Sequence, residues 1–408
     1  MISNPHIDMA EATRLTREGR LQEAMAVLQG KPASVTTPGS RRDAGHPQAP
    51  NAEPIDMIAP TPGSGGAWTA PEAQPAAPAA ANPAPATAKP RGPLARSLID
   101  KLRSMPLAGA RRKGQVAASA VLPDGAHFDS HTFSGGGEQR DYRLYVPGSH
   151  RDRPLPLVVM LHGCTQSPED FAAGTGMNAL AEAQGFLVAY PAQPSSANGS
   201  RCWNWFNAGD QQRDRGEPAL IAGITRQVMG QFAVDPARVY VAGLSAGGAA
   251  AAIMARTYPD LYAAIGVHSG LACGAATDVA SAFSAMRQGG TGVDTGSDGG
   301  SFPTIVFHGD KDRTVSPING VQVMAQSRGD ARLQVTDRRG SAPGGQDYTC
   351  TVETDDNGHP VLEHWLLHGG GHAWSGGSDA GSYTDPRGPD ASREMMRFFL
   401  QHSGPTAP

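Results

Sequence analysis

The sequence of 408 residues has few of the features that mark membrane, metal or nucleic-acid-binding proteins. It has no run of 18 apolar residues, which excludes an ordinary membrane span. Its four cysteines form no CxxC pair and no Cys/His spacing suited to structural zinc, so we expect no metal site and no cofactor. The net charge of -4 gives no general reason to bind nucleic acid. Small, neutral substrates are the better expectation.

The start of the chain also lacks the apolar core of seven or more residues that a secretory signal peptide needs. On this ground a cytoplasmic location stays open as an alternative. The cysteines, Cys164, Cys202, Cys273 and Cys350, leave disulfide pairing open, because a pairing pattern cannot be deduced from spacing.

The first part of the chain differs in composition from the rest. Residues 1–30 predict a helical hairpin, because residues 8–29 place apolar side chains at helical spacings on either side of Gly19. So short a hairpin cannot bury its own core, and residues 8–29 are a candidate surface for a protein partner or self-association, with a marginally stable tail as the alternative. Residues 31–93 are rich in Ala and Pro and predict a disordered linker. Residues 94–114 predict a short helix and a basic connector.

Residues 115–404 predict an α/β domain with a doubly wound, mainly parallel sheet. Short β-rich runs alternate there with helical stretches, which is typical of a sheet covered on both faces. The expected strands cover residues 142–146, 157–161, 186–190, 239–242, 264–268, 304–307 and 363–367. Loops that leave the carboxyl ends of such strands line the crevice in which ligands bind.

The segment VYVAGLSAGGAAAAIMA carries the clearest catalytic motif. It predicts a strand, a tight turn with a glycine two residues on either side of Ser245, and an Ala-rich helix, which is the context of a GxSxG nucleophile. Gly243 and Gly247 are expected where strand and helix approach too closely for a Cβ. We therefore predict that Ser245 is a nucleophile rather than only a helix N-cap.

A serine hydroxyl needs a base, and the base needs an orienting carboxylate. The segment PTIVFHGDKDRTVSP offers two acids after a buried strand; its HGxxDxxV arrangement favours Asp312, with Asp310 capping the turn. His372 is the predicted base, because the three glycines before it allow the imidazole to reach the crevice. His364 and His368, on or beside the preceding strand, are its competitors.

Acyl transfer also needs donors for an oxyanion. The backbone N–H of Ala246 is the first candidate, and that of Cys164 or Thr165, after the strand ending in His162-Gly163, is the second. His162 is expected to shape this loop.

Aromatic side chains should lie on the same side of the sheet. Trp203 and Trp205 in RCWNWFN, and Trp374 just after His372, are candidate substrate contacts for an apolar acyl or aryl group. The alternative is that they pack in the core.

Five segments together, LHGCTQSPEDFAAGTGMNALAEAQGFLVAYPAQ, RCWNWF, VYVAGLSAGGA, PTIVFHGDKDRTVSP and GGGHAWSGG, resemble the polyhydroxybutyrate (PHB) depolymerase family, within the feruloyl and acetylxylan esterase group. The resemblance spans residues 128–400 and implies an α/β-hydrolase fold, ester hydrolysis through an acyl-enzyme and an extracellular location. Carried onto this sequence, it implies Ser245 as nucleophile, Asp312 as acid, His372 as base, and Cys164 with Ala246 as oxyanion donors.

Depolymerases of this kind commonly carry a signal peptide and a separate polymer-binding domain, and neither is apparent in this sequence. We therefore expect short-chain hydroxyalkanoate oligomers or related small esters as substrates rather than solid polymer. A feruloyl or acetylxylan esterase, an acyltransferase, and an interaction module tethered through residues 1–90 with weak esterase activity are the alternatives.

Overall fold

A computed structural model describes residues 122–150, 153–291, 293 and 301–404. The predicted hairpin, linker and basic connector, residues 1–114, lie outside these ranges, and their assignments stay predictions. So does the partner surface predicted for residues 8–29.

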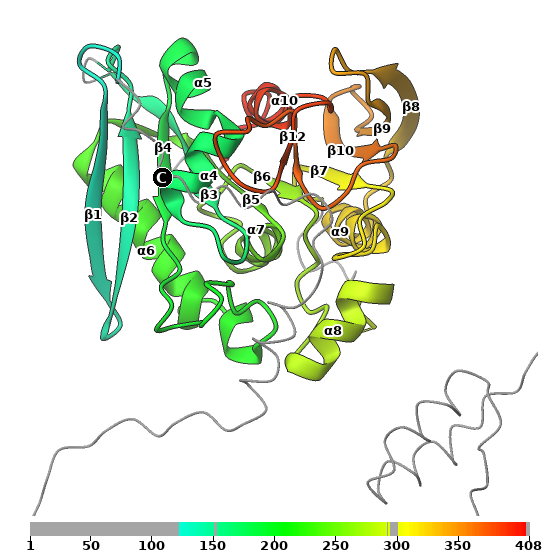
Figure 1. The fold of residues 1–408 in the computed structure, drawn as a ribbon, viewed down its shortest axis with the longest axis horizontal. Coiled ribbons are helices and arrows are strands. Elements are labelled where there is room, and N and C mark those ends of the chain that lie inside the picture. Colours follow the sequence, from blue (N-terminus) through cyan, green and yellow to red (C-terminus); the bar gives the residue numbers. More distant parts are fainter. Residues whose placement is uncertain (1–121, 151–152, 292, 294–300, 405–408) are drawn as a thin grey trace, which may run out of the picture. The chain divides into compact units, whose positions relative to one another are not determined.

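The described chain folds around one sheet of ten strands, in the order β1-β2-β4-β3-β5-β6-β7-β10-β9-β8 (Figure 1). In chain order the elements are β1 (His127–Gly135), β2 (Glu138–Val146), β3 (Leu155–Leu161), α4 (Pro168–Thr175), α5 (Met177–Gln184), β4 (Leu187–Pro191), η1 (Ala208–Gln211), α6 (Gly216–Gln231), β5 (Val234–Leu244), α7 (Ala246–Thr257), β6 (Ala264–His268), α8 (Val279–Gln288), β7 (Thr304–Gly309), α9 (Ile318–Arg328), β8 (Gln334–Ser341), β9 (Asp347–Thr354), β10 (Pro360–Leu367), β11 (Trp374–Ser375), β12 (Thr384–Asp385) and α10 (Ala391–Phe399). β11 and β12 form a separate two-stranded sheet.

The centre of the large sheet is parallel. β4, β3, β5, β6, β7 and β10 pair in parallel, whereas β1 and β2 extend one edge in antiparallel fashion and β9 and β8 extend the other. The predicted α/β-hydrolase class is thus confirmed. Six of the seven predicted strands lie within observed ones, and the seventh, residues 186–190, overlaps β4 but begins one residue before it. The prediction missed β1, β8 and β9.

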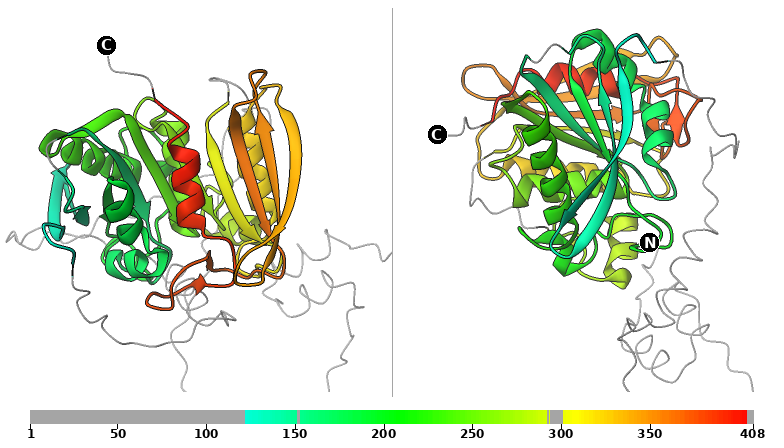
Figure 2. Two further views of the ribbon diagram at one scale, coloured as in Figure 1. Left: turned by 90° about the horizontal axis from the view of Figure 1, so that it is seen from above. Right: turned by 90° about the vertical axis from the view of Figure 1, so that its left-hand side faces the viewer.

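Apolar strands in the centre allow helices to cover both faces. β3, β4, β6 and β7 are buried along their whole length, as parallel strands between two helical layers must be. Residues of α6, α7, α8 and α9 join the core on one face, and residues of α4, α5 and α10 join the core on the other (Figures 1 and 2).

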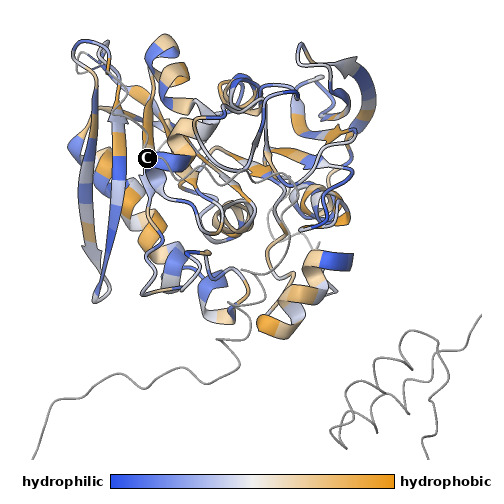
Figure 3. Cartoon of the chain, in the orientation of Figure 1, coloured by the Kyte–Doolittle hydropathy of each residue, from blue (hydrophilic) through white to orange (hydrophobic). Residues whose placement is uncertain are grey.

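The edges of the sheet differ from its centre in polarity. β8 is exposed along nearly its whole length and is mainly hydrophilic, whereas the central strands and α7 are mainly hydrophobic (Figure 3). In the described ranges, no helix is both long enough and apolar enough to cross a membrane.

Candidate active site

Ser245 lies on the sharp turn between β5 and α7. Its φ is +58°, a conformation that L-residues rarely adopt, and its N–H donates to His268 O at 2.9 Å. A Cβ on Gly243 would collide with the Gly247 backbone, and one on Gly247 would collide with Leu161 O of β3. The two glycines therefore permit the close approach that holds Ser245 at the end of the strand.

Asp312 and His372 come together at the carboxyl ends of β7 and β10. The His372 Nδ1 lies 2.7 Å from Asp312 Oδ2, and the two side chains are 9% and 0% exposed. Since a carboxylate can only accept, Nδ1 carries the proton and Nε2 has a free lone pair. The imidazole is thereby fixed in the tautomer that a general base requires.

The Asp312 carboxylate is held from several sides. Its Oδ1 accepts the N–H groups of Thr314 and Val315, each at 2.9 Å, and His308 Nε2 lies 3.6 Å from Oδ2. Burial alone would raise the Asp312 pKa, but the charge and hydrogen bond of His372, with His308 and the Val315 N–H, hold it below its usual value. Asp312 is therefore ionised at neutral pH.

A second Asp–His pair lies on the same two loops. His368 Nδ1 is 3.2 Å from Asp310 Oδ2, and Asp310 Oδ1 accepts the Gly369 N–H at 2.8 Å. The other nitrogen of His368 contacts Thr349 Oγ1 at 2.9 Å. Asp310 thus caps a turn, in the role expected of it.

Three buried histidines near the site have a pKa that burial holds well below its usual value. Burial, with His308 and His372 nearby, lowers the His268 pKa to about 3, and its Nε2 accepts the Ser375 N–H. Burial lowers the His162 pKa to about 4, and its two nitrogens contact Gly163 O and the Gln193 N–H. Burial lowers the His364 pKa to about 4 as well. These imidazoles are neutral structural groups.

The loop after β3 carries the candidate oxyanion donors. Thr165 N–H donates to Ser200 O at 2.7 Å, so it is already engaged. Within the described residues, neither the Cys164 nor the Ala246 N–H has a hydrogen-bond partner. Of the two donors that the spacing left open, Cys164 is therefore the one available to a ligand, together with Ala246 at the N-terminus of α7.

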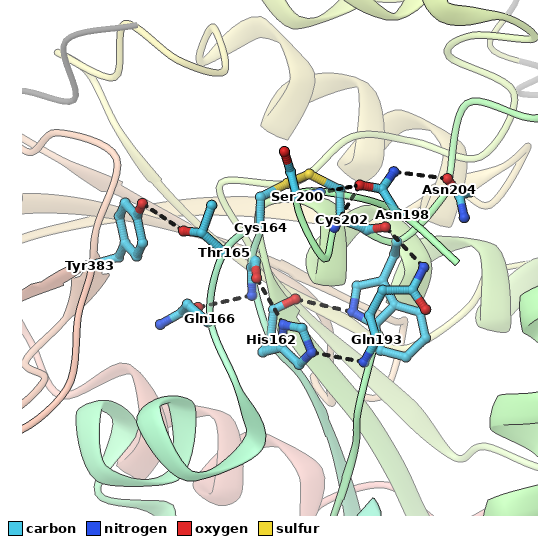
Figure 4. The surroundings of a disulfide bond; sticks show 12 residues. His162, Cys164, Thr165, Gln166, Gln193, Asn198, Ser200, Cys202, Asn204 and Tyr383 are labelled. Carbon is cyan, nitrogen blue, oxygen red and sulfur yellow. Dashed lines mark hydrogen bonds between the residues drawn. A yellow bond between two sulfur atoms is a disulfide. The ribbon is translucent and has the colours of Figure 1, made fainter. Parts of the chain in front are cut away.

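A disulfide fixes this loop. Cys164 is bonded to Cys202, which lies on the loop after β4 (Figure 4). Cys273 and Cys350 are free. The spacing of the cysteines carried no signal for this pairing.

The family of the chain follows from its sequence. Residues 140–342 match the family described as esterase PHB depolymerase. The chain belongs to the PHB depolymerase family of esterases. The matched family and relatives are named esterases and depolymerases, and the fold of this chain is that of an α/β-hydrolase.

Two curated relatives represent the range of this group. The poly(3-hydroxyalkanoate) depolymerase C of Paucimonas lemoignei is 35% identical over 228 residues, covering 53% of this chain and 54% of the relative. The feruloyl esterase B of Thermothelomyces thermophilus is 31% identical over 191 residues, covering 43% of this chain and 64% of the relative. The chain thus spans about half to two thirds of the length of these relatives.

A solved structure supports the fold. The acetyl xylan esterase from Aspergillus awamori aligns with a TM-score of 0.54 at 21% identity, covering 67% of this chain and 99% of that chain. At this identity the likeness concerns the fold alone.

Two hollows share Ser245 as a lining residue. The catalytic hollow is lined by, among others, Ser245, His372, Cys164, Thr165, Met286 and Tyr383. The apolar hollow is lined by, among others, Ser245, Trp205, Phe206, Leu271, Phe283 and Met286. The first brings the predicted nucleophile and base to one cavity, and the second adds an apolar wall beside the same serine.

The predicted tryptophan contacts divide between hollow and core. Trp205 lines the apolar hollow. Trp203 is fully buried and donates from Nε1 to His162 O, and Trp374 is 1% exposed and donates to Ser392 Oγ. Trp203 and Trp374 line neither hollow. The prediction that they contact substrate is therefore wrong, because each indole packs in the core and donates its hydrogen bond there.

Sequence reasoning missed Tyr383, and it considered Thr165 only for its backbone N–H and not for its hydroxyl. Their hydroxyls are 3.0 Å apart at the catalytic hollow, although 218 residues separate them in the chain (Figure 4). Both residues have positive φ, at +55° and +66°. No local motif signals this contact, because it joins two loops that are far apart in the sequence. Among the described residues, no cluster of three or more His, Cys, Asp or Glu side chains could hold a metal ion.

Proposed function

We propose that the chain hydrolyses short-chain hydroxyalkanoate oligomers or related small esters through an acyl-enzyme on Ser245, with His372 as base and Asp312 as its orienting acid. The observation that carries the proposal is the buried 2.7 Å contact of Asp312 with His372, whose imidazole lines the same hollow as Ser245. A serine, an imidazole with a free Nε2 and an ionised carboxylate are the three groups that acyl transfer from an ester requires.

In the first step, His372 Nε2 takes the proton from Ser245 Oγ as the oxygen attacks the ester carbonyl carbon. The carbonyl oxygen becomes negative and is bound by the Cys164 and Ala246 N–H groups. The C–O bond to the alcohol then breaks, and the alcohol leaves with the proton from His372. Water repeats these steps on the acyl-enzyme and releases the acid and the free serine.

The apolar hollow supports an acyl group of modest size. Trp205, Phe206 and Met286 offer apolar surface beside Ser245, which favours a short alkyl or aryl chain over a charged one. The Thr165 and Tyr383 hydroxyls in the catalytic hollow offer hydrogen bonds to the polar part of an ester.

Purified protein with Ser245→Ala tests the proposal. We expect hydrolysis of p-nitrophenyl butyrate to fall by at least about 10⁴-fold, while circular dichroism and melting temperature stay unchanged. Turnover close to that of the unmodified protein would overturn the assignment of Ser245.

A substrate panel tests the ester class. Hydroxybutyrate oligomers, feruloyl esters and acetylated xylan should be compared by kcat/KM, and we expect the oligomers to be preferred. The alternative, a feruloyl or acetylxylan esterase, draws on the relative named feruloyl esterase B at 31% identity, and preference for either of the other substrates would favour it. Product analysis with added alcohols would separate hydrolysis from acyl transfer.

A further inference from the structure

Glu217 is a buried acid that the proposed mechanism does not use. It lies in the first turn of α6, is 6% exposed, and accepts hydrogen bonds from the loop after β4. Its Oε2 accepts the Asn204 N–H and its Oε1 accepts Asn204 Nδ2, each at 2.6 Å. Gln193 Nε2 also donates to Oε1. Three donors from one loop therefore converge on a single carboxylate.

These donors link Glu217 to the candidate oxyanion loop. The side-chain Nε2 of Gln193 also donates to Cys202 O at 2.9 Å, and the backbone N–H of Gln193 donates to His162 Nε2 at 3.1 Å (Figure 4). Cys202 in turn is bonded to Cys164, whose N–H is a candidate oxyanion donor. A shift of the loop after β4 would thus reach Cys164 both through the disulfide and through His162.

The same loop forms part of the apolar hollow. Asn204, which Glu217 holds by two contacts, directly precedes Trp205 and Phe206. Trp205 and Phe206 line the apolar hollow, whereas Asn204 and Glu217 line a separate polar cleft. Glu217 therefore holds this loop through Asn204 and does not itself line the apolar hollow.

We propose that Glu217 is a positioning residue for the ester hydrolysis proposed above: its ionised carboxylate holds residues 202–204, and through them Cys164 and Trp205, in the arrangement needed for turnover. This inference rests on the proposed function. When the carboxyl is protonated, one of its oxygens carries a proton, so the three donors lose part of their acceptor and the loop is held less firmly.

Burial and the charges around Glu217 allow both the ionised and the protonated form of its carboxyl to be populated near neutral pH. Burial, with the negative Asp210 of η1 adding to it, raises the pKa of Glu217 to about 7, against the lowering effect of the Asn204 and Gln193 hydrogen bonds. Glu138 and Arg140 of β2 line the same cleft, and Arg140 donates to Gln193 Oε1. Turnover should therefore gain from the carboxylate above about pH 7 and lose this support below it.

The test compares Glu217→Gln with the unmodified protein between pH 5.5 and 8.5, with p-nitrophenyl butyrate as substrate. The ratio of the two kcat values cancels the titration of the catalytic base, which both proteins share. We expect the unmodified protein to be about tenfold faster at pH 8.5 and within about twofold at pH 5.5, with KM changed less than kcat. A ratio that is the same at all pH values, or near one throughout, would overturn the proposal.

Glu182→Gln is the matched control. The Glu182 carboxylate of α5 also accepts one backbone and one side-chain donor, from Gly148 and Tyr145, but it has no contact with the loops at Ser245. Its kcat ratio to the unmodified protein should not depend on pH.

Asp210→Asn provides a second test if Glu217→Gln fails to fold. Asn retains the Oδ1 that accepts the Glu217 N–H at 2.9 Å but removes the negative charge that raises the Glu217 pKa. The acid-side fall of kcat should then move to lower pH, and an unmoved profile would contradict the proposal. The result for Ser245→Ala is independent of both tests, so failure of this inference can be told from failure of the proposed function.

Discussion

The two Asp–His pairs on the loops after β7 and β10 have the same residue types but different surroundings. Asp312 and His372 are 2.7 Å apart with side chains 0% and 9% exposed, whereas Asp310 and His368 are 3.2 Å apart with side chains 29% and 40% exposed. Within the described chain, His372 Nε2 has no hydrogen-bond partner and His368 Nε2 contacts Thr349. The two pairs therefore differ in what they leave available: His372 lines the cavity that Ser245 lines, whereas both nitrogens of His368 are in contact with other side chains.

Replacement of the two histidines should separate the pairs most strongly. We expect His372→Ala to lower kcat for p-nitrophenyl butyrate by at least about 10⁴-fold, because no other group can take the Ser245 proton. His368→Ala should stay within about threefold, since this imidazole lines neither hollow. A large loss for His368→Ala and a small one for His372→Ala would reverse the assignment.

Replacement of the two acids, Asp312 and Asp310, should give the second-largest difference in kcat. Asp312→Asn should lower kcat by about 10³- to 10⁴-fold, because an amide can donate to Nδ1 and favour the wrong imidazole tautomer. Asp310→Asn keeps an oxygen for the Gly369 N–H and should change kcat by less than about threefold. Assays at one substrate concentration well above KM are sufficient to compare kcat. Equal losses of kcat in the two variants would contradict the different roles assigned to Asp312 and Asp310.

The sequence predicted the central sheet and the members of the buried pair for different reasons. The parallel strands are continuous apolar runs, so their positions are local information. Asp312 and His372 follow such strands, and the strand order brings their loops together. The edge strands were missed because β8, QVTDRRGS, has neither an apolar run nor an apolar alternation and depends on pairing with β9.

Contacts between distant loops could not be predicted from local pattern. The Cys164–Cys202 bond, the Thr165–Tyr383 contact and the burial of Trp203 and Trp374 all depend on how loops pack. The local sequence around a tryptophan two residues from a catalytic candidate is the same whether its ring faces a cavity or the core. Only the packing separates Trp205, which lines a hollow, from Trp203, which does not.

The apolar hollow beside the buried pair should affect acyl preference more modestly. Phe206→Ala removes apolar surface next to Ser245. We therefore expect kcat/KM for p-nitrophenyl butyrate to fall by about fivefold relative to p-nitrophenyl acetate, which corresponds to about 1 kcal/mol of lost apolar contact. Val335→Ala, on the exposed strand β8, is the control and should leave the butyrate-to-acetate ratio unchanged. An unchanged ratio in Phe206→Ala would exclude this hollow as the acyl site.

The smallest expected effect is on stability and depends on pH. The folded pKa of Asp312 lies below its usual value, so the ionised carboxylate adds stability above the unfolded pKa of about 3.9, and this stability is lost as pH falls through the folded pKa. Asp312→Asn should therefore melt about 2 to 4 °C below the unmodified protein at pH 7, for a loss of about 1 kcal/mol.

This difference in melting temperature should shrink as the pH is lowered towards 3, because the unmodified protein then loses the contribution that the variant lacks throughout. Ser245→Ala keeps both Asp312 and His372 and should follow the unmodified protein at every pH. A gap that stays constant, or widens in acid, would show that Asp312 stabilises the fold through its shape and hydrogen bonds rather than its charge. The buried pair would then differ from the exposed one in packing alone.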